Sequence, residues 1–187
     1  FLSIFITSIP FIVWDIIFVK NGIWGFNKNY ISGIYIFNLP IEELLFFFII
    51  PFCCMYTYHL IEKLNISFFK INNWKKINLY LAFSLLVFAS FFFNKQYTFF
   101  CLTLCSLLIF YGYFSDKINY NSFYTLFIII MIPFVLVNGA LTGLFLNQYV
   151  VWYNQNEILN IYLFTIPIED IFYSFQLILL NIMVYKN

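Results

Sequence analysis

The stretch Pro40-Ile-Glu-Glu-Leu-Leu-Phe-Phe-Phe-Ile-Ile-Pro51 places two carboxylates at the start of a long apolar run. The same pattern returns at Pro167-Ile168-Glu169-Asp170, again ahead of an apolar segment. The two copies hold four of the eight acidic residues in the chain. Carboxylates at membrane depth are costly and mark functional sites. Both tetrapeptides are therefore candidate site motifs.

The composition predicts a membrane protein. The 187 residues are 64% hydrophobic and only 9% charged, which leaves too few polar groups to cover a soluble globule. Apolar runs recur near the length of about 20 residues that crosses a bilayer as a helix. We expect an all-α, polytopic transmembrane helical bundle, forming one domain over residues 1–187. The predicted spans are Phe1–Val19, Leu39–Leu60, Ile77–Phe93, Tyr97–Phe114, Phe123–Val137 and Ile166–Tyr185.

An internal repeat relates the two motifs. Trp24–Pro51 aligns with Val151–Ile178 without gaps, with ten identities in 28 positions. Further upstream, the alignment pairs Asp15 with Asn138. We place one half at approximately 1–60 and the other at approximately 97–187. Both motif helices then enter the membrane from the same side, so the repeat is parallel.

The lysines predict which side that is. Cytoplasmic loops are enriched in Lys and Arg. On the predicted topology, the motif side carries three lysines and the opposite side six. We expect the motifs to enter from the non-cytoplasmic side, in a bacterial inner (cytoplasmic) membrane. The two groups are Lys20, Lys28 and Lys95 on the motif side, and Lys63, Lys70, Lys75, Lys76, Lys117 and Lys186 on the other.

The acidic pairs favour acid–base chemistry on an apolar substrate. Acids in a first helical turn also complement the helix dipole, so capping is the simpler alternative for either pair alone. The duplication, and Asp15 inside the first span, argue for more than capping. Two neighbouring carboxyls can share one proton, leaving a neutral acid beside an anionic base. Nearby aromatic faces could stabilise a transient carbocation.

An ordered series of motifs resembles one known family, the small membrane-integral lycopene β-cyclases of bacteria, archaea and fungi, whose halves are fused here. The series is Trp14-Asp15-Ile-Ile-Phe, Gly22-Ile-Trp24-Gly-Phe-Asn27, Leu39-Pro-Ile-Glu-Glu43, Asn138-Gly-Ala-Leu-Thr-Gly143 and Ile166-Pro-Ile-Glu-Asp170. The resemblance implies cyclisation of lycopene ends to β-ionone rings without net redox change, by an isomerase (intramolecular lyase) of carotenoid biosynthesis. It also implies a further helix before Phe1.

The resemblance carries catalytic roles over to Glu42, Glu43, Glu169 and Asp170, and we expect the identical positions Glu42 and Glu169 to matter most. The expected partners are lycopene or a related linear carotenoid, the lipid bilayer and other carotenoid-pathway enzymes, but no nucleic acid. We predict no cofactor and no metal. The expected substrate-binding residues are Trp14, Asp15, Trp24, Asn27, Asn138, Trp152 and Asn154.

Three other functions stay open from the sequence. The nearest is a related cyclase that acts on a C50 carotenoid or forms an ε-ring. A second is a small membrane transporter subunit, for which duplicated halves and midplane carboxylates are also typical. The third is a purely structural bundle whose acids only cap helices.

Overall fold

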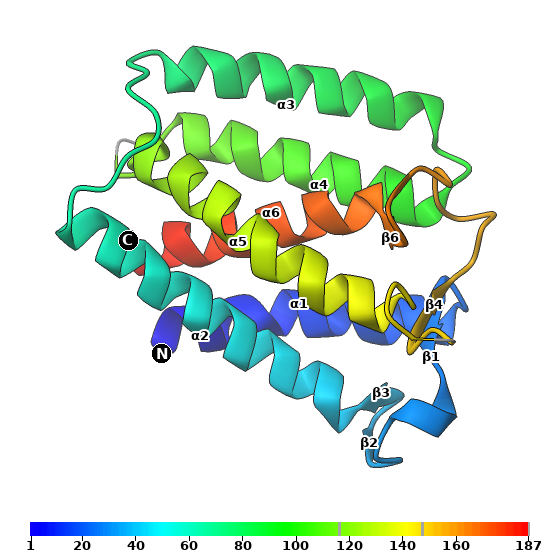
Figure 1. Ribbon diagram of the computed structural model, residues 1–187. Helices are drawn as coiled ribbons and strands as arrows, with labels where there is room; N and C mark the ends of the chain where they lie inside the picture. The colour runs from blue at the N-terminus through cyan, green and yellow to red at the C-terminus, as the bar shows by residue number, and fades with distance from the viewer. Residues whose placement is uncertain (116, 147, 187) are drawn as a thin grey trace.

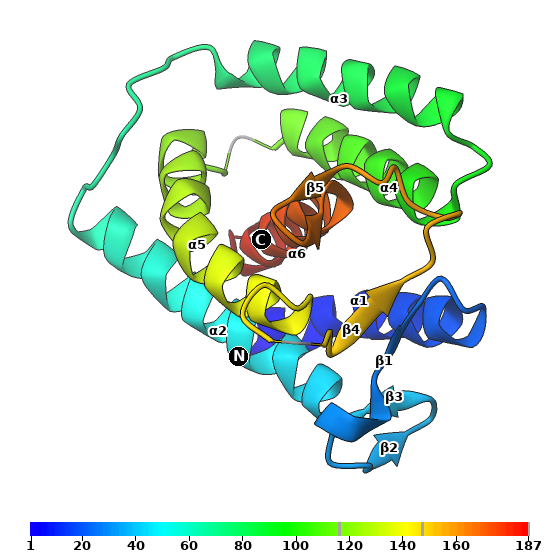
Figure 2. The same cartoon turned by 45° about the vertical axis from the view of Figure 1, so that its right-hand side comes forward.

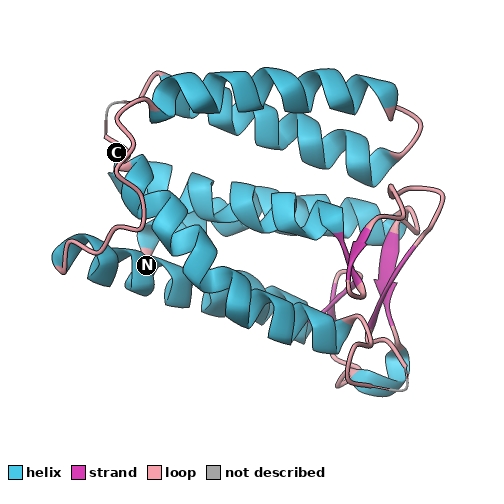
Figure 3. Ribbon diagram, turned by 45° about the horizontal axis from the view of Figure 1, so that its top comes forward, coloured by secondary structure: helices cyan, strands magenta, loops and turns pink. Residues whose placement is uncertain are grey.

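A computed structural model describes residues 1–115, 117–146 and 148–186, and it is dominated by six long helices (Figure 1). Six short strands lie between them, gathered at one end of the bundle (Figure 3). The helices are α1 (Leu2–Lys20), α2 (Ile41–Lys63), α3 (Trp74–Phe91), α4 (Gln96–Tyr113), α5 (Tyr120–Leu141) and α6 (Ile168–Lys186). The strands are β1 (Trp24–Phe26), β2 (Tyr35–Ile36), β3 (Leu39–Pro40), β4 (Val151–Tyr153), β5 (Tyr162–Leu163) and β6 (Ile166–Pro167).

The helices confirm an all-α membrane bundle. Five of those in the described residues, α1, α2, α4, α5 and α6, are long and apolar enough to cross a bilayer. The predicted span Ile77–Phe93 also forms a helix, α3, but it falls outside those five. Lys75, Lys76 and Asn78 make its first two turns polar. Because α3 lies alongside α4, it runs through the same depth of the bundle (Figures 1 and 2).

The helices of the two halves of the repeat pack against one another. The first half supplies α1 and α2, and the second supplies their counterparts α5 and α6. Helix α1 packs on α6 of the other half, and α5 likewise packs on α2. Both motif helices begin at the end of the bundle that carries the strands, so the repeat is parallel (Figure 1). The motif helices therefore pack against helices of both halves of the chain.

A two-stranded ribbon joins the halves at this end. Strand β1 pairs antiparallel with β4, with Gly25 opposite Trp152 at its centre. In the repeat alignment Gly25 is the counterpart of Trp152, so a local two-fold axis passes between them. The ring of Trp152 lies over Gly25, where an added Cβ would come within 2.5 Å of it. Where the two strands pair, the large ring of Trp152 therefore occupies the space that a side chain at Gly25 would need.

Asn27 and Asn154 close the ribbon with matching hydrogen bonds. The Asn27 backbone N–H donates to Val150 O (2.7 Å), and the Asn154 backbone N–H donates to Ile23 O (2.8 Å). Their side-chain amides donate to Tyr149 O (3.2 Å) and Gly22 O (3.4 Å). The acceptors are also repeat counterparts, because Val150 corresponds to Ile23 and Tyr149 corresponds to Gly22. The identities at these two positions therefore maintain the junction between the halves.

A short hairpin precedes each motif, β2–β3 in one half and β5–β6 in the other. Each turns through a Phe in the left-handed region, Phe37 and Phe164, both at φ 58°. A bulky residue seldom adopts this conformation. Its occurrence at equivalent positions shows that the repeat extends to the details of the backbone.

Candidate active site

The first acid of each motif binds the loop before it. Glu42 Oε1 accepts a hydrogen bond from the Ser32 backbone N–H at 2.7 Å. Glu169 Oε1 accepts one from the Leu159 backbone N–H, also at 2.7 Å. Ser32 and Leu159 are repeat counterparts, so both glutamates have the same anchoring contact.

The surroundings of these two glutamates differ. Glu42 lies exposed at the edge of the bundle, whereas Glu169 is 0% exposed. Helix α4 covers Glu169, and the Thr98 hydroxyl donates a further hydrogen bond to Glu169 Oε1 at 2.5 Å. Neither glutamate lines the apolar cavity that the described residues form between the helices. Their geometry fits a structural role in placing the motif.

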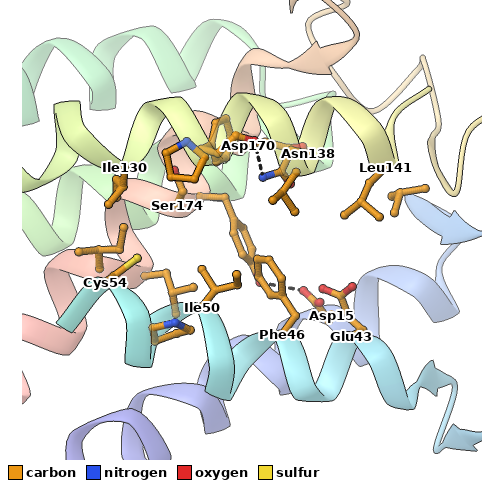
Figure 4. Close-up of a pocket in the computed structure, with 18 of the residues that line it drawn as sticks. Asp15, Glu43, Phe46, Ile50, Cys54, Ile130, Asn138, Leu141, Asp170 and Ser174 are labelled. Atoms are coloured by element: carbon orange, nitrogen blue, oxygen red, sulfur yellow. Dashed lines mark hydrogen bonds between the residues drawn. The ribbon is translucent and has the colours of Figure 1, made fainter. Parts of the chain in front are cut away.

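The second acid of each motif faces that cavity instead. Glu43 and Asp170 line a space of about 240 Å³ between α1, α2, α5 and α6, and Asp15 of α1 joins them. Figure 4 shows Glu43 and Asp15 side by side, with Asp170 on the opposite wall. Adjacent residues on a helix point in directions about 100° apart, so an acid pair places one carboxyl at the loop and the other inside. The cavity thus gathers three carboxyl groups from three helices.

Asp170 is held by two tyrosine hydroxyls, one on each carboxylate oxygen. Tyr97 of α4 donates to Oδ1 at 2.6 Å, and Tyr153 of β4 donates to Oδ2 at 2.7 Å. Burial raises the pKa of Tyr153 well above its ordinary value, and the nearby charge of Asp170 raises it further. The Tyr153 phenol therefore stays protonated and remains a donor. Two short bonds from neutral donors favour an ionised carboxylate.

Asp15 and Glu43 form a carboxyl pair. Asp15 is only 2% exposed. The two side chains lie side by side in the cavity (Figure 4). The Tyr173 hydroxyl of α6 also donates to Asp15 Oδ1, at 2.9 Å. Two neighbouring carboxyls of this kind can share one proton between them.

Aromatic rings surround the acids. The indole of Trp24 meets the Tyr97 ring edge-on, with centroids 4.8 Å apart. The rings of Tyr97 and Tyr153 are stacked at 6.1 Å. Phe26, Phe46, Phe134 and Tyr173 complete the aromatic part of the cavity wall. Faces of such rings attract a positive charge, so the cavity can hold a transient cation as well as exclude water.

The structure separates the predicted site residues into two groups. Asp15, Trp24, Glu43, Asn138 and Asp170 line the cavity. The others, all outside its lining, are Trp14, Asn27, Glu42, Trp152, Asn154 and Glu169. Three of these belong to the ribbon, and the two glutamates anchor loops. Trp14 lies behind the wall, its ring packed edge-on against Tyr173 at 5.2 Å.

Three tyrosines at the acids were not predicted as site residues. The sequence could have indicated Tyr173 as a site residue, because it lies three residues after Asp170 and so on the same helical face. Tyr153 lies in a strand whose pairing joins distant parts of the chain. Tyr97 belongs to α4, and nothing in the repeat marks it. Only the packing of α4 on α6 brings it to Asp170.

A bundle of membrane helices around a carboxyl-lined apolar cavity defines a membrane protein equipped for acid–base chemistry. A sequence profile described as lycopene cyclase matches residues 1–61 and 94–187. The chain belongs to the lycopene cyclase family, and it is an integral membrane cyclase of carotenoid biosynthesis. This membership decides against a transporter subunit. The unmatched residues 62–93 include α3. Comparisons with curated proteins and with solved structures give no match.

Proposed function

We propose that this protein cyclises the linear ends of lycopene to β-ionone rings by adding one proton and removing another. The observation that supports this most is the meeting of Asp15, Glu43 and Asp170 in one apolar, aromatic-walled cavity. The reaction leaves the molecular formula unchanged, so it is an isomerisation and needs no external oxidant or reductant. The setting is the bacterial inner membrane.

The Asp15–Glu43 pair supplies the proton in this proposal. A carboxyl that shares a proton with its neighbour can act as an acid even near neutral pH. Transfer of the proton to the terminal double bond of lycopene leaves a tertiary carbocation. The aromatic walls stabilise this cation, and exclusion of water prevents its capture.

Asp170 removes the second proton. The electron pair of the neighbouring internal double bond attacks the cation and closes the ring by a new carbon–carbon bond. The positive charge moves to a ring carbon, and loss of an adjacent C–H proton to Asp170 forms the ring double bond. Hydrogen bonds from Tyr97 and Tyr153 fix Asp170 in place and favour its ionised form for this step. Return of the proton from Asp170 to the Asp15–Glu43 pair restores the starting state.

Expression of the full-length protein in a lycopene-accumulating bacterium tests this function. We expect red lycopene to fall while γ-carotene or β-carotene appears on chromatography. In D₂O, each new ring should gain one deuterium at the site of protonation. Unchanged pigment from a well-inserted protein would refute the proposal, and an ε-ring product would refute the assignment of ring type.

A further inference from the structure

The cavity has a second, apolar end in the middle of the membrane helices. Away from the acids, its walls come from facing stretches of α2 and α5 (Figure 4). Pro51 of α2 and Pro133 of α5 both lie there, inside their helices. Proline removes a backbone hydrogen bond and kinks a helix. The two proline-containing segments form opposite walls of one passage.

This end reaches the outer surface of the bundle. Cys53, Pro133 and Val137 line the cavity and are nevertheless exposed, Val137 by 43%. All three belong to helices long and apolar enough to cross the bilayer; Cys53 and Pro133 lie well inside them, and Val137 lies one turn before the end of α5. A surface at that depth is in contact with lipid chains rather than water. The cavity therefore opens sideways between α2 and α5.

The acid end is covered instead. Trp24, Phe26, Val151 and Tyr153 of the β1–β4 ribbon line the cavity at this end. Trp24 is only 6% exposed. The ribbon thus lies between the acids and the aqueous side of the membrane.

The size of the cavity agrees with a side opening. Pockets that enclose a whole drug-sized ligand usually have about 300–1,000 Å³. A space of about 240 Å³ holds one end of a long polyene and no more. The rest of the molecule has to lie outside the cavity while that end reacts.

We infer that the gap between α2 and α5 is the substrate port, through which one end of a linear carotenoid slides from the bilayer to the acids. The inference rests on the proposed function for the identity of the substrate. Cys53 and Val137 form the rim of the port, and the unreacted part of the polyene extends between them into lipid. Because Asp15 and its repeat counterpart Asn138 face the same cavity, the two halves build one site. The two ends of lycopene then react in separate visits, with a monocyclic carotenoid released between them.

A bulky ring at the rim tests the port. We expect Val137→Trp to slow cyclisation by about tenfold or more, since an obstructed approach lowers the association rate. Ile132→Trp is the matched control, because Ile132 lies on the same helix, is 71% exposed and is not part of the cavity lining. The control should cyclise lycopene at the parental rate. Equal rates for both variants and the parent would overturn the port.

Pigment binding separates this inference from the proposed function. In an Asp170→Asn background that does not turn over, lycopene that co-purifies with the protein reports occupancy by its visible absorption. Adding Val137→Trp should reduce this pigment several-fold, and adding Ile132→Trp should not. If no variant ever cyclises lycopene, the proposed function fails, and the pigment result still decides the port. Undiminished pigment in the Val137→Trp protein would contradict it.

Discussion

The two copies of the Pro-Ile-Glu-acid motif have the same backbone and different neighbours. Each follows a hairpin with a left-handed Phe, and each uses its first glutamate to hold the loop. The second acids differ. Glu43 lies beside another carboxyl, Asp15, whereas Asp170 lies between two tyrosine hydroxyls.

The two halves thus share one backbone frame and differ in the chemistry of the side chains that it carries. The counterpart of Asp15 is Asn138, so only the first half can form a carboxyl pair of this kind. The counterpart of Tyr153 is Phe26, so only the second half supplies a hydroxyl there. In the proposed mechanism, the first motif gives the proton and the second takes it.

The largest expected effect separates the two acids of the first motif. Glu43→Gln removes a member of the proton-sharing pair, and we expect cyclisation to fall by roughly 10²–10⁴-fold, the usual contribution of a general acid or base. Glu42→Gln keeps an oxygen for the Ser32 N–H and should stay within a few-fold of the parent. Product formation from lycopene in isolated membranes, normalised to inserted protein, measures both. Comparable losses in the two variants would remove the distinction.

A smaller effect is expected at the tyrosines of the second motif. Tyr153→Phe deletes one of the two donors to Asp170, and a hydrogen bond to a charged group contributes about 1.5–3 kcal/mol. We expect a rate loss of roughly 10–100-fold with the thermal unfolding midpoint little changed. Phe26→Tyr, at the counterpart position, is the control and should not raise the rate. A Tyr153→Phe enzyme with the parental rate would show that Asp170 does not depend on this donor.

The loop-anchoring glutamates should differ in stability rather than chemistry. Glu169→Ala leaves the buried Thr98 hydroxyl and the partly buried Leu159 N–H without their acceptor, at a cost of about 1–3 kcal/mol. Glu42→Ala changes an exposed side chain, and such changes usually stay within about 0.5 kcal/mol. Thermal unfolding in detergent micelles should rank the two proteins in that order. Equal midpoints would mean that α4 contributes nothing to holding the second motif.

The smallest expected effect concerns the β1–β4 ribbon, where the two halves make equivalent contacts. Asn27→Ala and Asn154→Ala each remove equivalent side-chain hydrogen bonds across the ribbon, so each should cost about 1 kcal/mol. The same unfolding experiment applies, with exposed Asn29→Ala as the control. A large difference between Asn27→Ala and Asn154→Ala would show that the ribbon is not balanced about its two-fold axis.

The sequence predicted the helices well, because hydropathy and length report directly on which segments cross a bilayer. The expected span Leu39–Leu60 is close to helix α2, Ile41–Lys63. The repeat also placed both motifs on one side. Helix α3 shows the limit of this signal, because polar residues in its first turns lower its mean hydropathy while it still packs along α4.

The candidate site was less predictable, because sequence spacing does not show which helix faces meet. From the repeat, we predicted that the identical residues Glu42 and Glu169 matter most for catalysis. In the structure, both residues make the same hydrogen bond to the preceding loop. That weighting stays a prediction, and the geometry favours Glu43 and Asp170 instead. Asn27 holds the ribbon together instead of binding in the cavity, and this role arises from the pairing of strands more than 120 residues apart. Trp24, for example, is paired with Tyr153. Such long-range register leaves little trace in a single sequence.

The division of labour within the second motif gives the most direct test, because both of its acids are buried. The measurement is the rate of ring formation by Asp170→Asn and Glu169→Gln proteins in the same membranes, normalised to folded protein. Asp170→Asn keeps the shape of the side chain but cannot take up a proton, and it should lose at least roughly 10²-fold. Glu169→Gln keeps an oxygen for Thr98 and Leu159 and should retain most of the parental rate. An inactive Glu169→Gln enzyme beside an active Asp170→Asn enzyme would contradict this assignment.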